Sequence, residues 1–138
     1  MQAHVESKRQ GENEETRDDS QAAALQKVRE LIGQKDLTLA DETLNKMLVE
    51  DPKNPEVWTL KGKIYSESKN YVEAHRFFQK ALLNQSHHKE ALWERAETYE
   101  KQGLELKAKE VYEAYLLHHA DSEQAPLAKE RINKISPP

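Results

Sequence analysis

The chain contains no cysteine, and it has only 4 glycines and 5 prolines among its 138 residues. Without cysteine it can form no disulfide, zinc–thiolate site, iron–sulfur cluster or cysteine nucleophile. Its glycines, at positions 11, 33, 62 and 103, are too far apart to build a glycine-rich phosphate-binding loop. No stretch approaches the roughly 20 apolar residues that a membrane-spanning helix needs. We therefore expect no direct insertion into a membrane.

Half of the chain, 69 of its 138 residues, is alanine, leucine, lysine, arginine or glutamate, all of which favour helices. Residues that favour strands are few, because valine, isoleucine and threonine together number only 15. This composition is typical of long helices, a coiled coil or helical repeats. It predicts an all-α fold.

The first twenty residues differ from the rest, since they contain no Leu, Ile, Phe, Tyr or Trp, and they carry three basic and six acidic side chains. They cannot bury enough apolar surface to offset the entropy of ordering, so residues 1–20 are predicted to be a disordered polar tail. They also lack the apolar core of a signal peptide. We expect a cytoplasmic protein, with a periplasmic one as the alternative if a signal or membrane anchor was removed before residue 1.

Residues 21–138 are close to neutral, with 18 basic and 19 acidic side chains. A nucleic-acid-binding protein needs a strong excess of basic side chains. No nucleic-acid partner is therefore expected.

The chain repeats itself with a period of 34 residues. Similar residues recur in four columns, which are Ala40, Ala74 and Ala108; Leu44, Phe78 and Tyr112; Leu31, Tyr65 and Tyr99; and Leu48, Leu82 and Leu116. A fixed period of this length indicates a repeat architecture. The units are residues 21–54, 55–88 and 89–122.

Each unit reads as two helices joined by a short turn, and the second unit shows this most clearly. Asn54 followed by Pro55 is a good helix start, and Lys69-Asn70 falls where the turn is expected. The small Gly62 and Ala74 would let the two helices approach closely. One helix pair cannot cover its own apolar face, so the units are expected to stack.

The run Trp58-x2-Lys61-Gly62-x2-Tyr65, followed by Ala74-x3-Phe78-x2-Ala81, resembles the signature of the tetratricopeptide repeat (TPR) family. The third unit matches through Leu92, Ala96, Tyr99, Ala108 and Tyr112, and the first unit matches more weakly. The chain departs from the pattern at Lys61, where the family prefers Leu, and at Ser86 and Ala120, where it prefers Pro. The resemblance implies an α-solenoid, a right-handed superhelix of three helix pairs.

One more helix is expected after the third unit, over residues 123–136. Ser122 is a plausible N-cap, and the apolar stripe consists of Ala125, Ala128, Ile132 and Ile135. Such a helix, polar on its outer side, would cap the end of the solenoid. The total is about seven helices.

The resemblance also implies that the first helix of each pair lines an inner groove that binds a peptide or helical segment of another protein. The matching positions are Leu25, Arg29, Ile32, Thr59, Lys63, Ser66, Trp93, Glu97 and Glu100, with Arg131 and Lys134 at the far end. Trp93 lies about 100° away from the core stripe of its helix and is expected to be an exposed binding hot spot. The alternative is that it packs against the neighbouring first helix, near Thr59 or Lys63.

One class of TPR partner can be compared position by position. Co-chaperones of this family hold the carboxylates of heat-shock-protein tails with Lys, Asn and Arg side chains. The matching places here hold Leu25, Arg29, Leu60, Trp93 and Glu97. Because only one of these is basic, the sequence predicts that the groove is not of this carboxylate-clamp type.

Two histidine pairs are the most visible candidates for chemistry. His87-His88 and His118-His119 would lie at the ends of second helices, about 10 Å apart if the helices have their usual spacing. They are weak metal-ligand candidates, because no thiol or fixed acidic cluster accompanies them. No metal and no cofactor are therefore predicted.

The serines and threonines are not placed on a sharp turn beside a base, so the sequence predicts a non-enzymatic adaptor or scaffold, monomeric or weakly homodimeric. The alternative is a structural or chaperone-like component that self-associates or joins a larger secretion or envelope complex, with the apolar end at Leu25, Ile32 and Leu39 left uncovered.

Overall fold

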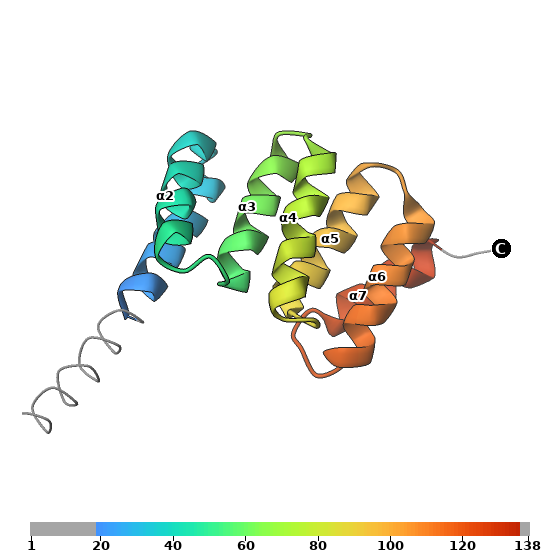
Figure 1. Ribbon diagram of the computed structural model, residues 1–138. Coiled ribbons are helices and arrows are strands. Elements are labelled where there is room, and N and C mark those ends of the chain that lie inside the picture. The colour runs from blue at the N-terminus through green and yellow to red at the C-terminus, as the bar shows by residue number, and fades with distance from the viewer. Residues whose placement is uncertain (1–18, 136–138) are drawn as a thin grey trace, which may run out of the picture.

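A computed structural model describes residues 19–135, and all regular structure in that range is helical. The first helix covers residues 19–33. It is followed by α2 (Leu37–Glu50), α3 (Pro55–Glu67), α4 (Tyr71–Asn84), α5 (Lys89–Lys101), α6 (Glu105–His118) and α7 (Ala125–Ile135) (Figure 1). Most of the predicted tail, residues 1–18, lies outside the described residues, and Asp19 and Ser20 belong to the first helix.

The turns inside the three helix pairs are copies of one another. Lys35, Lys69 and Gly103, which occupy the same position in successive repeats, have φ angles of 64°, 64° and 75°. In each turn the next residue donates its backbone N–H to the carbonyl oxygen five residues back at 2.9 Å: Asp36 to Leu31, Asn70 to Tyr65, and Leu104 to Tyr99. This is the pattern that ends a helix at a left-handed residue. Each helix pair is therefore closed by the same kind of turn.

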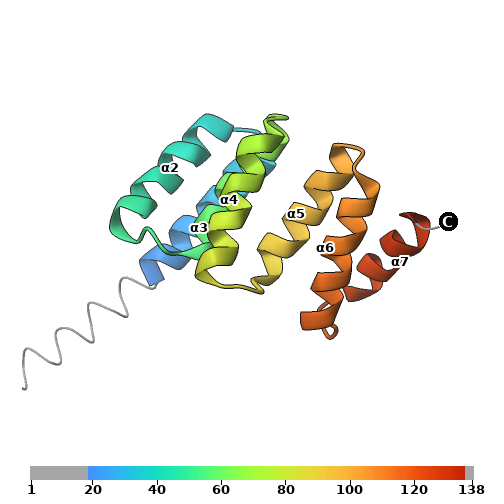
Figure 2. The same ribbon diagram turned by 45° about the vertical axis from the view of Figure 1, so that its right-hand side comes forward.

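The helices stack in chain order into an extended solenoid. Direct contacts join α3 to α4 and α5 to α6, each second helix to the helix that follows it, and α3 to α5. The first helix joins α2 and α3 through shared apolar residues. Figures 1 and 2 show α2, α4 and α6 following one another along the molecule, with all three ending at the same edge. The final helix, α7, packs on α6. The fold is therefore the all-α solenoid that the repeat predicts.

Two apolar clusters hold the stack together. One joins the first helix, α2 and α3 through Leu25, Val28, Leu31, Ile32, Ala40, Leu44, Val57, Leu60 and Ile64. The other joins α5, α6 and α7 through Leu92, Trp93, Ala96, Ala108, Tyr112, Tyr115 and Ala128. Because Leu25 and Ile32 are buried, the expectation of an uncovered apolar end is wrong at these two residues, whereas Leu39 is 45% exposed.

Lys61 stands where a TPR prefers leucine, and the structure shows how a lysine is accommodated there. Its ammonium lies 2.7 Å from both Asp41 Oδ1 and Asn45 Oδ1 on α2. It is also 5.1 Å from the ring centroid of Phe77 and 5.4 Å from that of Tyr65. The aliphatic stem is thus buried, while the charge is neutralised and hydrogen-bonded.

None of the helices within residues 19–135 has the length and apolar character needed to cross a bilayer.

Candidate partner-binding face

The inner face of the solenoid is defined here by Arg29, Lys63, Glu97 and Arg131, which recur at one repeat position on the first helix, α3, α5 and α7. The sequence places eleven residues on this side, and the structure divides them by accessibility. Five are buried, namely Leu25, Ile32, Thr59, Ser66 and Trp93. Six keep accessible surface, namely Arg29, Lys63, Glu97, Glu100, Arg131 and Lys134. The face that a partner can touch is therefore mainly charged.

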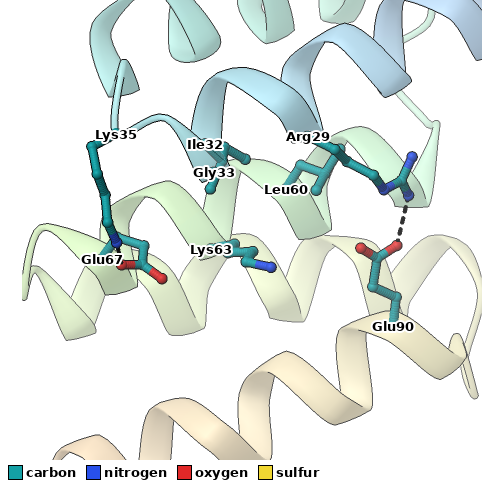
Figure 3. A pocket seen from close by; sticks show the side chains of 8 residues that line it. All are labelled: Arg29, Ile32, Gly33, Lys35, Leu60, Lys63, Glu67 and Glu90. Carbon is teal, nitrogen blue, oxygen red and sulfur yellow. Dashed lines mark hydrogen bonds and ion pairs between the residues drawn. The ribbon is translucent and has the colours of Figure 1, made fainter.

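A pocket of about 270 Å³ opens on this face between the first helix, α3 and α5 (Figure 3). Ile32 and Leu60 form the apolar part of its lining. The charged part consists of Arg29, Lys35, Lys63, Glu67 and Glu90. Figure 3 shows Lys63 between the Arg29–Glu90 pair on one side and the Lys35–Glu67 pair on the other. The pocket thus combines an apolar floor with a cation flanked by two ion pairs.

Ion pairs link successive first helices across the inner face. Arg29 lies 3.0 Å from Glu90 and 3.5 Å from Glu56. Lys63 lies 3.4 Å from Glu94. The arginine and lysine side chains are 37% and 35% exposed. The pairs of Arg29 are partly exposed, and pairs of this kind contribute only about 0–1 kcal/mol each, so the guanidinium can be redirected toward a bound partner at little cost. The Lys63 pair differs, because its Glu94 is buried.

Glu94 is the most perturbed carboxyl group on this face. Burial raises its pKa to about 7, in spite of the nearby ammonium of Lys63. Next to it on α5, Thr98 donates its hydroxyl to the carbonyl oxygen of Glu94 at 2.7 Å and lies 2.9 Å from Ser66 Oγ on α3. The contact between α3 and α5 is therefore polar and buried, and its charge changes near neutral pH.

Trp93 is not the exposed hot spot that the sequence predicts, because only 5% of its surface is accessible. Its ring meets those of Tyr112 and Tyr115 on α6, each at 5.3 Å between centroids, and the Arg131 guanidinium lies 5.1 Å from its centroid. Trp93 lies outside the apolar stripe of α5, but α6 and α7 together cover the side of α5 that carries it.

Arg131 holds α7 in place at the end of the inner face. Its Nη1 donates to Glu97 Oε2 at 3.0 Å and to the Tyr112 hydroxyl at 2.7 Å. Lys134 is exposed and pairs with Glu130 on its own helix at 3.2 Å. Arg131 therefore joins α5, α6 and α7, whereas Lys134 contributes no link across the face.

The histidine pairs lie much closer together than the sequence predicts. The rings of His87 and His118 stack with 3.5 Å between centroids, and His119 Nε2 contacts the carbonyl oxygen of His87. The predicted separation of about 10 Å, that of two neighbouring helices, is therefore wrong. His88 is buried, and burial lowers its pKa. No group of three or more His, Cys, Asp or Glu side chains suited to a metal ion occurs in the described part of the chain.

Sequence reasoning missed several residues of the pocket, above all Lys35, Glu67 and Glu90. Glu67 lies one helical turn after Lys63, so its place on the same face could have been found from the helix period alone. Glu90 was overlooked because it faces Arg29 from a different repeat, 61 residues away. A pairing of that separation depends on the stacking angle, which the sequence does not specify.

Comparisons with known proteins show which families and solved structures the chain resembles. Residues 55–88 match the family model described as tetratricopeptide repeat. A search of the curated proteins finds no relative of the chain. Among solved structures, the chain resembles the first TPR of Spaghetti (RPAP3) bound to an HSP90 peptide, with a TM-score of 0.71, 20% identity and coverage of 82% of this chain and 89% of that one.

Two further solved structures are similar. The second TPR domain of human RPAP3, in complex with an HSP70 peptide, has a TM-score of 0.68 at 19% identity and covers 83% of this chain and 93% of its own. The TPR2B domain of yeast Sti1, in complex with an Hsp70 peptide, has a TM-score of 0.69 at 14% identity, with coverage of 81% and 95%.

These similarities overturn the prediction that the groove is not of the heat-shock-protein type. All three similar domains are solved with HSP90 or HSP70 peptides. The exclusion compared five side chains, and three of them, Leu25, Leu60 and Trp93, are buried in this structure. Their identities therefore say little about what the accessible surface binds.

Proposed function

We propose that the chain is a protein–protein interaction module that binds a segment of a partner protein along its inner face, in keeping with the tetratricopeptide repeat match at residues 55–88. The partner segment lies across the first helix, α3 and α5. In this role the chain acts as an adaptor or scaffold and not as an enzyme.

The pocket beside Lys63 is the observation that carries this proposal. Its volume of about 270 Å³ suits one or two side chains of a bound segment, not a large cofactor. Ile32 and Leu60 offer an apolar floor for an aliphatic side chain, and Lys63 offers an ammonium to a carboxylate. A segment with an apolar side chain next to an acidic group or chain terminus fits these features.

The weak ion pairs support the same conclusion. Arg29 and Lys63 each keep more than a third of their side-chain surface exposed while paired with a glutamate. A partner's carboxylate can therefore replace Glu90 as the ligand of Arg29, and it can reach the exposed side of Lys63 beside the buried Glu94. The exchange keeps each cation neutralised and makes binding sensitive to salt.

A catalytic role has less support. The hydroxyls of Ser66 and Thr98 are buried and hydrogen-bonded to one another, so neither is presented to a substrate. The buried carboxyl of Glu94 faces Lys63 from the neighbouring helix. Its raised pKa follows from burial between two helices, which is a structural cause.

The proposal is tested by titrating the purified chain with defined peptides and by capturing partners on the immobilised protein. The HSP90 peptide SRMEEVD and the HSP70 peptide SGPTIEEVD, which similar domains bind, are suitable first probes. We expect Lys63→Glu to weaken partner binding by about tenfold or more. Lys27→Glu is the matched control, because Lys27 is exposed on the first helix and does not line the pocket. Equal binding by all three proteins would show that the inner face is not the binding surface.

A further inference from the structure

The second and third units each carry a cation at the same repeat position, but the two cations have different surroundings. Lys61 on α3 holds this position in the second unit, and Arg95 on α5 holds it in the third. The ammonium of Lys61 lies 2.7 Å from both the carboxylate of Asp41 and the amide oxygen of Asn45 on α2. One repeat later, the position of Asp41 is occupied by His75 on α4. Arg95 therefore has a histidine where Lys61 has a carboxylate.

The guanidinium of Arg95 is only partly satisfied by the residues that the structure describes. Its Nη2 donates to the Tyr99 hydroxyl at 3.3 Å, and its Nε is buried with no hydrogen-bond partner among residues 19–135. It takes part in none of the ion pairs in this range. A guanidinium binds carboxylates strongly because its N–H groups match the two carboxylate oxygens. The third unit thus presents a cation without supplying the carboxylate that suits it.

Three further side chains join Arg95 to form the Arg95 patch, which consists of His75 on α4, Arg95 and Tyr99 on α5, and Lys107 on α6. His75 stacks on Tyr99 with 4.1 Å between the ring centroids. The guanidinium of Arg95 and the ammonium of Lys107 lie 5.7 Å and 5.8 Å from the centroid of Tyr99. Burial lowers the pKa of His75, and the two cations lower it further. The patch thus gathers two positive charges around one aromatic ring.

The patch lies on the side of α5 that faces α4 and α6. Both of these helices pack on α5 and make no direct contact with each other, and Figure 2 shows α5 between them. Lys107 is exposed, and the other three side chains are half-buried. None of the four lines the inner-face pocket. The patch is therefore accessible to a partner and separate from the inner face.

The acidic side chains of α4 and α5 do not neutralise the patch. All four glutamates of α5 pair with cations of the inner face, namely Glu90 with Arg29, Glu94 with Lys63, and Glu97 and Glu100 with Arg131. The one acidic residue of α4, Glu73, pairs with Arg76 on its own helix at 3.0 Å. Neither helix therefore offers a free carboxylate to Arg95 or Lys107.

The acidic side chains of α6 face away from the patch. They are Glu105, Glu110 and Glu113, which repeat the positions of Leu37, Glu42 and Asn45 on α2. On α2 these positions face the following unit, because Leu37 and Glu42 line a pocket together with residues of α3. The same positions on α6 face α7. The positive charge of the Arg95 patch is thus not balanced from any of the three helices that form it.

We propose that the Arg95 patch is a second protein-binding site, which takes an aspartate or glutamate side chain from an acidic segment of a partner. The second unit shows the chemistry, because Asp41 neutralises Lys61 at the equivalent position. At Arg95 the partner's carboxylate has this role, and Lys107 provides a second cation beside it. Since the patch and the inner face share no residue, one chain can hold two proteins at once, as a scaffold does.

NMR titration of the whole chain with hexaglutamate, followed at the Arg95 side-chain Nε–Hε group and the Tyr99 backbone amide, tests the proposal. We expect saturable shifts at a probe concentration of about 1 mM, and added salt should reduce them. Arg95→Gln should raise the dissociation constant by about tenfold or more, and the exposed Lys107→Gln should raise it as well. Lys129→Gln is the matched control, because Lys129 is exposed on α7 and its loss removes the same single charge.

Two substitutions of His75 distinguish a defined site from a general effect of charge. His75→Asp places a carboxylate beside Arg95, as Asp41 lies beside Lys61, so it should fill the site from within and abolish the shifts at Tyr99. His75→Asn loses the same ring contacts without adding a charge, and it should retain binding. Thermal unfolding checks that both variants are folded.

The proposal has defined ways to fail. A wild-type chain without shifts at Tyr99 would overturn it, as would equal weakening in Lys129→Gln or undiminished binding by His75→Asp. Inorganic phosphate that shifts the same resonances at lower concentrations than hexaglutamate would also overturn it, in favour of a phosphorylated partner.

Discussion

The indole of Trp93 meets the ring of Tyr112 edge-on, with 5.3 Å between the two centroids and an angle of 67° between the planes. Tyr112 is fully buried, and the Arg131 guanidinium lies over the same indole. The contact between Trp93 and Tyr112 therefore joins α5 to α6, and Arg131 of α7 packs on the same indole. The tryptophan that the sequence marks for binding instead belongs to the core of the C-terminal half.

Trp93→Ala is therefore expected to act on stability. Truncating a buried tryptophan costs about 3–5 kcal/mol of the free energy of unfolding, since it leaves a cavity between α5 and α6. Urea denaturation followed by circular dichroism measures this loss. Trp58→Ala is the comparison, because Trp58 is only half-buried and bonds through Nε1 to the Pro52 carbonyl oxygen at 2.8 Å. A Trp93→Ala protein as stable as the wild type would contradict the burial of this ring.

Gly62→Ala is expected to destabilise the protein, although alanine is the better helix former by about 1 kcal/mol. A Cβ at position 62 would overlap the ring of Phe78 on α4, because that ring lies directly against the glycine. Overpacking of this kind costs about 1–3 kcal/mol. Thermal unfolding of the single variant and of Gly62→Ala with Phe78→Leu measures the effect. The second change should recover part of the loss, and an equally unstable double variant would rule out the clash as its cause.

Glu94 is expected to make stability depend on pH. Its pKa is raised above the ordinary 4.5 to about 7 in the folded chain, so the folded state holds the proton more tightly than the unfolded state does. The resulting stabilisation is fully present below about pH 4.5 and is lost as the pH rises through 7. Glu94→Gln, which stays neutral, should be more stable than the wild type at pH 8 by up to about 3 kcal/mol. The two proteins should differ little near pH 4.5.

Denaturation of both proteins from pH 4.5 to pH 8 checks this expectation. Glu110→Gln serves as the control, because Glu110 is exposed. Parallel pH profiles for Glu94→Gln and the wild type would mean that the carboxyl group is not buried as described.

Arg131→Ala is expected to loosen α7 without unfolding the rest. The guanidinium bonds to Glu97 on α5 and to the Tyr112 hydroxyl on α6, and hydrogen bonds to charged groups contribute about 1.5–3 kcal/mol each. Hydrogen exchange should rise in residues 125–135 and stay unchanged in α3 and α4. Lys134→Ala removes only a pair within α7 and should leave exchange unaltered. Uniform protection in both variants would show that α7 is held by its apolar stripe alone.

The sequence predicted the fold well, because the fold follows from local rules that repeat. Gly62 and Phe78 mark a close helix pair, and the residues at 35, 69 and 103 mark the turns that place each second helix on its first. These features act between residues that are near in sequence. Because the same features recur in three units, each prediction of a helix or turn was supported at three places in the chain.

The candidate site was predicted less well, because it depends on contacts between units. The sequence could place Arg29 and Lys63 on one face, but it could not show that Glu90 and Glu94 pair with them across the stack. Burial was misjudged for the same reason. Trp93 lies off the stripe of its own helix, and only the positions of α6 and α7 reveal that it is covered.

Site-specific photo-crosslinking at Lys63 tests the central claim most directly. The lysine is replaced with p-benzoylphenylalanine, and the exposed Lys27 is replaced in a second protein as the control. On irradiation in the presence of partner proteins, we expect a covalent adduct with a partner segment at position 63 and none at position 27. Adducts at position 27 alone, or equally at both positions, would contradict a partner-binding role for the inner face.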